Sequence, residues 1–346
     1  MSDLIKVESS EENLLSDLRG LIDDARQRVA ASVNAELTML YWRVGSRIRA
    51  DVLQNERADY GKQIVATLSQ QLTAEYGKGF DRANLFNMIR FAEVFADDQI
   101  IYALSRQLTW THFRRIIYLN DDLKRNFYAE MCRIERWSTR TLAKKIDSML
   151  FERTALAKKP DELIKQELAA LRMEDKLTPD LVFRDPYFLE FLNLAGNHSE
   201  KDLESAILRD LERFLLELGS DFAFVARQKR IVIDDEDYYL DLLFYHRKLR
   251  RLVLVELKIG KLKAADVGQI ELYLRWLDKY ERQAGEEQPI GLILCTEKGG
   301  QMIELLELEE RGIRVAEYWA ELPPREMLER KLLDAVRLAK LEQENK

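Results

Sequence analysis

The stretch DYYLDLLFYHRKLRRLVLVELKI, residues 237–259, decides the fold of the C-terminal half of the chain. It contains two short runs of aliphatic and aromatic residues bounded by polar residues, a pattern typical of buried strands. The link RKLR between the runs is short enough for an antiparallel hairpin. If the strands pair symmetrically about the middle of that link, Asp241 lies directly opposite Glu256, with Cβ atoms roughly 5 Å apart.

Two charged side chains interrupt the second strand. Glu256 and Lys258 share one face because side chains alternate along a strand, and the hairpin register adds Asp241 to them. Two carboxylates so close repel each other, and a bound divalent cation would offset that repulsion. Such a cation polarises a phosphodiester and activates a water, while a lysine stabilises the developing charge. The alternative is a polar strand face whose Glu256–Lys258 ion pair contributes little.

The segments around the hairpin predict an α/β domain with a mixed sheet. A preceding helix, closed by Gly219, and a following helix have apolar residues at helical spacing. In chain order we expect a helix at 202–219, strands at 222–233, 237–246 and 251–259, a helix at 264–280, a strand at 289–295, a helix near 301–310 and a strand at 313–317.

The N-terminal half predicts an all-helical domain, since the first 159 residues contain none of the six prolines and only five of the fourteen glycines. Residues 11–55 predict one long amphipathic helix. Its apolar positions are Leu14, Leu18, Leu21, Ile22, Ala25 and Val29. Breaks at 76–80 and 136–137, each followed by a capping residue (Asp81 and Ser138), predict two helix-turn-helix-like units. Ordinary helical hairpins are the alternative.

Charge changes sign near residue 160. Residues 1–160 carry a net charge of +3 and the remainder −10, and residues 101–159 hold 13 basic against six acidic side chains. A basic helical surface is suited to binding phosphates through counterion release, although it is also typical of a solvated helix face. The residues that we expect to contact nucleic acid are Arg82, Asn84, Arg90, Arg114, Arg115, Arg140, Lys144 and Lys145.

Other classes of protein are disfavoured. Two cysteines, Cys132 and Cys295, are too few for a disulfide framework, and three scattered histidines do not form a zinc motif. The N-terminus lacks the apolar core of a signal peptide, and the longest apolar runs are far shorter than the roughly 20 residues of a membrane span. We therefore expect a cytoplasmic protein without a membrane partner.

The charged residues of the hairpin carry a resemblance. The pattern D-(x14)-E-L-K at 241–258 resembles the PD-(D/E)XK nuclease signature, with Leu240 in place of the usual proline, and Gln269 and Tyr273 fit its Q-x-x-x-Y element. From about residue 12 to about residue 330 the chain is also similar to the bacterial YhcG-like proteins. The similar stretches are YWRVGSRI, YGKQIVATLSQQLTAEYGKGF, RQLTWTHF, WSTRTLAKKIDSMLFERT, FLLELGSDFAFVARQ, YYLDLLFYHRKLRRLVLVELK, PIGLILCTEK and VAEYWAELP.

This resemblance implies an α+β, two-domain protein: an all-α N-terminal domain that binds DNA, followed by a restriction-endonuclease-like α/β domain. We expect the helical domain at 11–155, a connector at 156–180, the nuclease domain at 181–330 and a helical tail at 331–346. The expected activity is hydrolysis of phosphodiester bonds in DNA with Mg²⁺, or alternatively Mn²⁺. A homodimer is expected because cutting two strands is simplest with two sites.

The resemblance also implies roles for single residues. Asp241 and Glu256 would ligate the cation, with the carbonyl oxygen of Leu257 as a third ligand, and Lys258 would be the catalytic lysine. Gln269 would orient that lysine or a phosphate.

Further residues complete the implied site. Tyr273 would support Gln269, and an acid on the helix before the first strand would add a ligand. We choose Glu204 for that ligand, with Glu212 and Glu217 as competitors. Gln228 either faces the site or bridges strands.

Two other functions stay open at this point. One is a non-catalytic DNA-binding or regulatory protein that retains the nuclease fold. The other is an assembly protein whose long N-terminal helix mediates oligomerisation.

Overall fold

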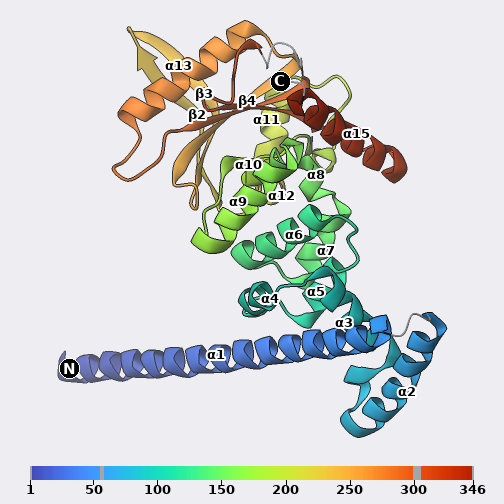
Figure 1. Ribbon diagram of the computed structural model, residues 1–346. Helices are drawn as coiled ribbons and strands as arrows, with labels where there is room; N and C mark the ends of the chain where they lie inside the picture. The colour runs from blue at the N-terminus through green and yellow to red at the C-terminus, as the bar shows by residue number, and fades with distance from the viewer. Residues whose placement is uncertain (1, 55–57, 299–304, 345–346) are drawn as a thin grey trace. The chain divides into compact units, whose positions relative to one another are not determined.

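The computed structural model describes residues 2–54, 58–298 and 305–344. The chain (Figure 1) divides into two compact units, with the boundary in the sequence between Lys145 and Ile146. The helical unit consists of α1 (Ser2–Gln54), α2 (Ala58–Tyr76), a 3-10 turn (Lys78–Phe80), α3 (Arg82–Val94), α4 (Asp98–Ser105), α5 (Trp110–Ile116), α6 (Asp122–Glu135) and α7 (Thr139–Asp147).

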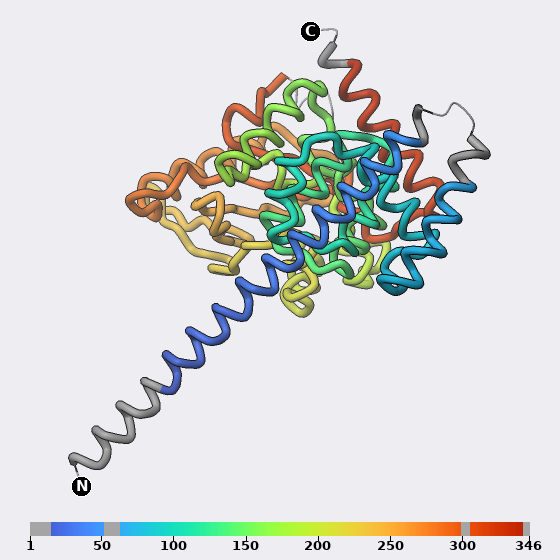
Figure 2. Tube along the Cα trace, turned by 60° about the horizontal axis from the view of Figure 1, so that its bottom comes forward, coloured from blue at the N-terminus to red at the C-terminus, as the bar shows by residue number. Residues whose placement is uncertain are grey.

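The long helix α1 packs against its own unit through its second half. Residues 15–30 are exposed, and Figures 1 and 2 show this part of α1 extending beyond the other helices of the unit. Further along, Tyr41 and Ile48 join Leu85 and Met88 in a buried cluster. The predicted helix is therefore present, but its expected apolar positions from Leu18 to Val29 are exposed, and the side chain of Leu14 lies outside the described ones.

Both predicted breaks in the helical unit are present. The Asp81 carboxylate accepts a hydrogen bond from the Asn84 main-chain N–H at 2.8 Å, and the Ser138 hydroxyl accepts one from Thr141 at 3.1 Å. Arg136 ends α6 in the left-handed conformation, with φ of 52°. These caps satisfy free N–H groups at the helix starts, as their sequence positions predict.

The second unit holds the sheet. Its helical segments are α8 (Leu150–Arg153), α9 (Asp161–Glu174), α10 (Pro179–Val182), α11 (Glu200–Arg209), α12 (Leu211–Leu218), α13 (Ala264–Tyr280), α15 (Arg325–Glu344) and 3-10 turns at Leu156–Lys158 and Glu190–Leu192. Its strands are β1 (Tyr187–Phe188), β2 (Phe222–Ile233), β3 (Glu236–His246), β4 (Arg251–Lys261), β5 (Ile290–Glu297) and β6 (Ile313–Trp319).

The sheet is mixed, as predicted. Its strand order is β1-β6-β5-β4-β3-β2, with β2, β3 and β4 antiparallel and β4, β5, β6 and β1 parallel. The β3–β4 hairpin pairs Leu242 with Val255 and His246 with Arg251, which is the register derived from the sequence. This register brings Asp241 and Glu256 to neighbouring positions on adjoining strands.

Helices cover both faces of the sheet. On one face, α13 packs through Ile270 and Leu274 against Leu254 of β4 and Ile293 of β5. On the other, Phe214 of α12 packs against Phe244 of β3, with ring centroids 6.0 Å apart. The sheet is thus buried between two helical layers, and Glu256, which is 2 % exposed, lies within an otherwise apolar stretch of β4.

Two details differ from the sequence expectations. The helix expected at 202–219 is two helices, because Asp210 leaves helical geometry with φ of −121° and ψ of 45°. Of the helix expected near 301–310, residues 301–304 lie outside the described residues, and 306–312 form turns. The expected connector is partly helical, since it contains α9, and α15 includes residues 331–344 of the expected helical tail. Among the described residues, no helix combines the length and apolarity needed to cross a bilayer.

Candidate active site

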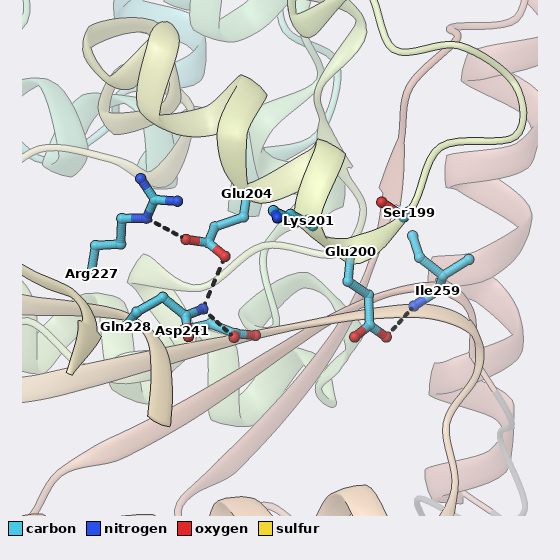
Figure 3. A pocket seen from close by; sticks show the side chains of 8 residues that line it. All are labelled: Ser199, Glu200, Lys201, Glu204, Arg227, Gln228, Asp241 and Ile259. Carbon is cyan, nitrogen blue, oxygen red and sulfur yellow. Dashed lines mark hydrogen bonds and ion pairs between the residues drawn. The ribbon is translucent and has the colours of Figure 1, made fainter. Parts of the chain in front are cut away.

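A cavity of about 760 Å³ opens between α11 and the strands β2, β3 and β4. Figure 3 shows Glu204 of α11 pointing into it toward Gln228 of β2 and Asp241 of β3. Glu200 and Lys201, one turn earlier on α11, also line the cavity. The Ser199 hydroxyl caps this helix, so its first turns are fixed at the mouth of the cavity.

The carboxylates of Asp241 and Glu256 each accept a hydrogen bond from the main chain of the neighbouring strand. Asp241 Oδ2 accepts a hydrogen bond from the Leu257 main-chain N–H at 3.0 Å. Glu256 Oε1 accepts one from the Asp241 main-chain N–H at 3.4 Å. Lys258 Nζ lies 3.7 Å from Glu256 Oε2. The structure thus brings Asp241, Glu256 and Lys258 together, and Leu257 contributes its N–H rather than its carbonyl to these contacts.

The surroundings of Asp241 and Glu256 disfavour the charged form of both carboxyl groups. Burial, together with the negative charge of Asp241, raises the pKa of Glu256 to about 8, although the charge of Lys258 acts in the opposite direction. Burial also raises the pKa of Asp241, against the lowering effect of its hydrogen bond from Leu257. A buried pair of this kind is stabilised by added positive charge. Its hard oxygen donors are those that Mg²⁺ and Mn²⁺ bind, so the residues fit a divalent cation.

Glu204 of α11 is the acid on the preceding helices that shares a hydrogen-bond donor, the Gln228 amide, with Asp241. It is 6 % exposed, and its oxygens accept hydrogen bonds from Arg227 Nε at 2.6 Å and from Gln228 Nε2 at 2.9 Å. Of its two competitors, Glu217 pairs with arginines elsewhere in the unit and Glu212 is exposed. The structure therefore places Glu204, and neither competitor, at the cavity.

Gln269 and Tyr273 form a pair on one face of α13. Gln269 Nε2 donates a hydrogen bond to Tyr273 Oη at 2.9 Å. Tyr273 is buried, which raises its pKa, and the charge of Glu256 adds to the increase. The Tyr273 side chain therefore lies near enough to the carboxylates to sense their charge, but no direct hydrogen bond joins it to Lys258 among the described residues.

The carboxylates of Glu204, Asp241 and Glu256 do not point at a common position. In the part of the chain that the structure describes, no group of three His, Cys, Asp or Glu side chains is arranged as a metal cage. Instead, each of the six carboxylate oxygens of Glu204, Asp241 and Glu256 has a partner within the protein. Asp241 Oδ1 accepts from the same Gln228 amide that serves Glu204, at 3.0 Å.

Sequence reasoning missed Arg227, Glu200 and Lys201. Arg227 precedes Gln228 on β2 and binds Glu204, and Glu200 Oε1 accepts the Ile259 main-chain N–H at 3.1 Å. The signal for Glu200 is its place one helical turn before Glu204. No sequence signal points to Arg227, because its partner depends on how α11 crosses the sheet.

The expected nucleic-acid residues of the helical unit fall into two groups. Arg114, Arg115, Arg140 and Lys144 are exposed, with Lys145 partly so, and Arg82 is exposed beside the Phe86 ring. Two others make contacts inside the unit.

Asn84 accepts a hydrogen bond from Trp110 Nε1 at 2.8 Å and donates to the Gly79 carbonyl. Arg90 donates to the Ile117 carbonyl at 3.3 Å and pairs with Glu93. These contacts hold the turn before α3 and its neighbour α5, so both side chains also serve the packing of the unit.

Comparisons with known proteins agree with this architecture. Residues 17–153 match the family model described as the DUF1016 N-terminal domain, and residues 180–333 match the model of the YhcG PDDEXK nuclease domain. The protein of Escherichia coli (strain K12) named "Putative nuclease YhcG" is 36% identical over 340 residues, which cover 89% of this chain and 90% of that protein.

Solved structures give weaker similarities, each spanning about half of the other chain. A repair endonuclease from Pyrococcus abyssi is 22% identical over 38% of this chain and 50% of its own, with a TM-score of 0.26. The complex of EndoMS with double-stranded DNA is 18% identical over 38% of this chain and 48% of its own, with a TM-score of 0.28. On the near full-length match to its relative and the two domain models, the chain belongs to the YhcG family, with a PDDEXK nuclease domain after the helical N-terminal domain.

Proposed function

We propose that this protein is a divalent-cation-dependent endonuclease that hydrolyses phosphodiester bonds in DNA. The observation that carries the proposal is the pairing of buried Glu256 with half-buried Asp241, with Lys258 beside them at the edge of a cavity. A structural ion pair would not need two such carboxyls against one lysine. Such an excess of buried negative charge is typical of sites that take a cation.

The roles follow from the contacts. Asp241, Glu256 and Glu204 would hold Mg²⁺ or Mn²⁺, which when bound polarises the scissile phosphate and lowers the pKa of a water. Lys258, 3.7 Å from Glu256, would orient the attacking water and stabilise negative charge on the phosphate. Gln269, fixed by Tyr273, would position the lysine or a phosphate oxygen.

The helical unit would engage the substrate. Its exposed basic side chains (Arg82, Arg114, Arg115, Arg140, Lys144 and Lys145) would contact phosphates, with Asn84 and Arg90 at the turn before α3. In this proposal the helical domain keeps the limits 11–155, the nuclease domain 181–330, and two copies act together on a duplex in the cytoplasm.

A cleavage assay tests the proposal. Full-length protein is incubated with linear, branched and modified DNA in Mg²⁺, Mn²⁺ or EDTA, beside Lys258→Ala and the control Lys279→Ala. Lys279 is exposed on α13, ten residues beyond Gln269 and about 15 Å along the helix. We expect cation-dependent cleavage, lost by about 10²-fold or more in Lys258→Ala and kept in the control.

Two results would count against this function. Equal cleavage by the wild type and Lys258→Ala would remove the lysine from the chemistry. Cation-independent DNA binding without cleavage would favour a binding or regulatory protein on the nuclease fold. Circular dichroism melting of each variant separates loss of chemistry from loss of structure.

A further inference from the structure

The Gln228 side chain occupies an unusual position among the acids of the cavity. Its single amide nitrogen donates to Glu204 Oε2 at 2.9 Å and to Asp241 Oδ1 at 3.0 Å, as Figure 3 shows. An amide nitrogen carries two hydrogens, so both are used on carboxylates. These two carboxylates come from different elements, α11 and β3, and Gln228 is the group that joins them.

The Gln228 main chain is held in a conformation that a glutamine rarely adopts. Its φ is +44°, inside a strand, and the β2–β3 ladder pairs Arg227 with Leu242 and Lys229 with Leu240 on either side of it. Left-handed residues outside glycine persist only where the surroundings determine them, and they concentrate at functional sites. Here the surroundings are the two carboxylates that the side chain serves.

We propose that Gln228 is a stand-in for the cation. In the cation-free protein its amide supplies the positive hydrogens that hold Glu204 and Asp241 together, and it must withdraw when a cation takes both oxygens. The inference rests on the proposed function, since it takes these acids as the cation ligands. It makes Gln228 a positioning residue that sets how readily the site loads.

The surrounding contacts favour this role over an ordinary bridge between strands. A bridging amide can use its carbonyl and its nitrogen on the main chain, whereas Gln228 spends its nitrogen on two acids. The other oxygen of each carboxylate is also hydrogen-bonded. Glu204 Oε1 accepts from Arg227 Nε, and Asp241 Oδ2 accepts from the Leu257 main-chain N–H. All four carboxylate oxygens of Glu204 and Asp241 are therefore hydrogen-bonded within the protein, and cation loading must break at least the two hydrogen bonds of Gln228.

Cation titration separates a stand-in from a supporting residue. Mg²⁺ and Mn²⁺ affinities of the full chain are measured by calorimetry and by thermal shift for the wild type, Gln228→Ala and Gln228→Gly. The glycine variant adopts a positive φ without strain, so it covers the case in which the alanine variant does not fold. Gln283→Ala is the control, because Gln283 is exposed and its amide donates to the Glu281 carbonyl at 3.0 Å.

A stand-in predicts tighter binding when it is removed. We expect the dissociation constant to fall in both Gln228 variants, the melting temperature without cation to fall in the alanine variant, and neither to change in the control. A residue that merely supports the ligands would instead weaken binding, typically by about 10- to 100-fold, and that result or unchanged affinity overturns the inference. A wild type that binds neither ion overturns both this inference and the cation dependence of the proposed function.

Discussion

Replacing Gly45 by alanine gives the sharpest test of how the helical unit is packed. A Cβ atom at Gly45 would lie 1.9 Å from the Met88 carbonyl oxygen and 2.3 Å from the Met88 carbonyl carbon, so α1 and α3 touch main chain to main chain here. The Met88 atoms that would clash with this Cβ belong to the main chain of α3, so no side-chain rotation can relieve the clash. On the same helix, a Cβ at Gly20 would meet nothing within 4 Å.

The magnitudes follow from these distances. Overpacking costs typically about 1–3 kcal/mol, and a clash with main chain belongs at the upper end, about 3 kcal/mol. Better helix propensity returns about 1 kcal/mol, which leaves Gly45→Ala destabilised by about 2 kcal/mol. Gly20→Ala gains the propensity term without the clash, so it should be stabilising by up to about 1 kcal/mol.

Urea unfolding read at Cys132 measures this effect in the helical unit alone. Cys132 is buried there, while Cys295 is buried in the second unit, so peptide-resolved thiol labelling follows each unit separately. With a denaturant slope of about 2 kcal/mol per molar, Gly45→Ala should shift the Cys132 midpoint down by about 1 M. An unchanged midpoint in Gly45→Ala, or an equal fall in Gly20→Ala, would refute the close crossing of α1 and α3.

Three further predictions concern buried groups. Burial raises the pKa of Cys132 and Cys295 to about 12, so alkylation at pH 8 should be slow in the native protein and complete in denaturant; fast native labelling of either would contradict its burial. Burial lowers the pKa of His246 to about 4, below its unfolded value near 6.5. Its contribution to stability is therefore full above pH 6.5 and lost as the pH falls toward 4, by up to about 3 kcal/mol, and urea unfolding of His246→Asn should show a flatter pH dependence over this range. Arg153→Met should lower the free energy of unfolding by about 2 kcal/mol, because it removes one of the two arginines that pair with the Glu217 carboxylate and leaves only Arg184, and a Cys295 midpoint equal to that of the wild type would exclude this role.

The hairpin that carries the candidate site could be predicted closely from the sequence. Polar residues mark the ends of both strands, and a four-residue turn leaves one symmetric register, so the observed Leu242–Val255 pairing follows from local information. The apolar spacing at roughly 264–280 likewise predicts a helix, and α13 occupies Ala264–Tyr280. Local signals thus fix elements whose partners are near in sequence.

Elements that depend on distant contacts could not be predicted. Strand β1 has two residues and pairs with β6, and Tyr187 meets Tyr318, far along the chain. The break at Asp210 has no glycine or proline to announce it, and the turn reorients α12 so that Phe214 meets Phe244. Such features are set by tertiary packing rather than by propensity.

The same distinction applies inside the candidate site. Alternation of side chains along two adjacent strands predicts that Asp241, Glu256 and Lys258 lie on one face. The pairing of Arg227 and Gln228 with Glu204 depends on the crossing of α11 over β2, which no local pattern encodes. The hydrogen-bond network around Glu204 therefore depends on the three-dimensional arrangement and is not encoded in a local sequence pattern.

The reciprocal hydrogen bonds between β3 and β4 make formation of the candidate site depend on folding of the sheet. Asp241 is held by the main chain of the next strand, and Glu256 by the main chain of the previous one. Neither carboxylate can reach its place before β3 and β4 pair, so the two carboxylates are brought together only when this hairpin forms. A chain in which these two strands are not paired would therefore lack the candidate site, even if its helical unit had already folded.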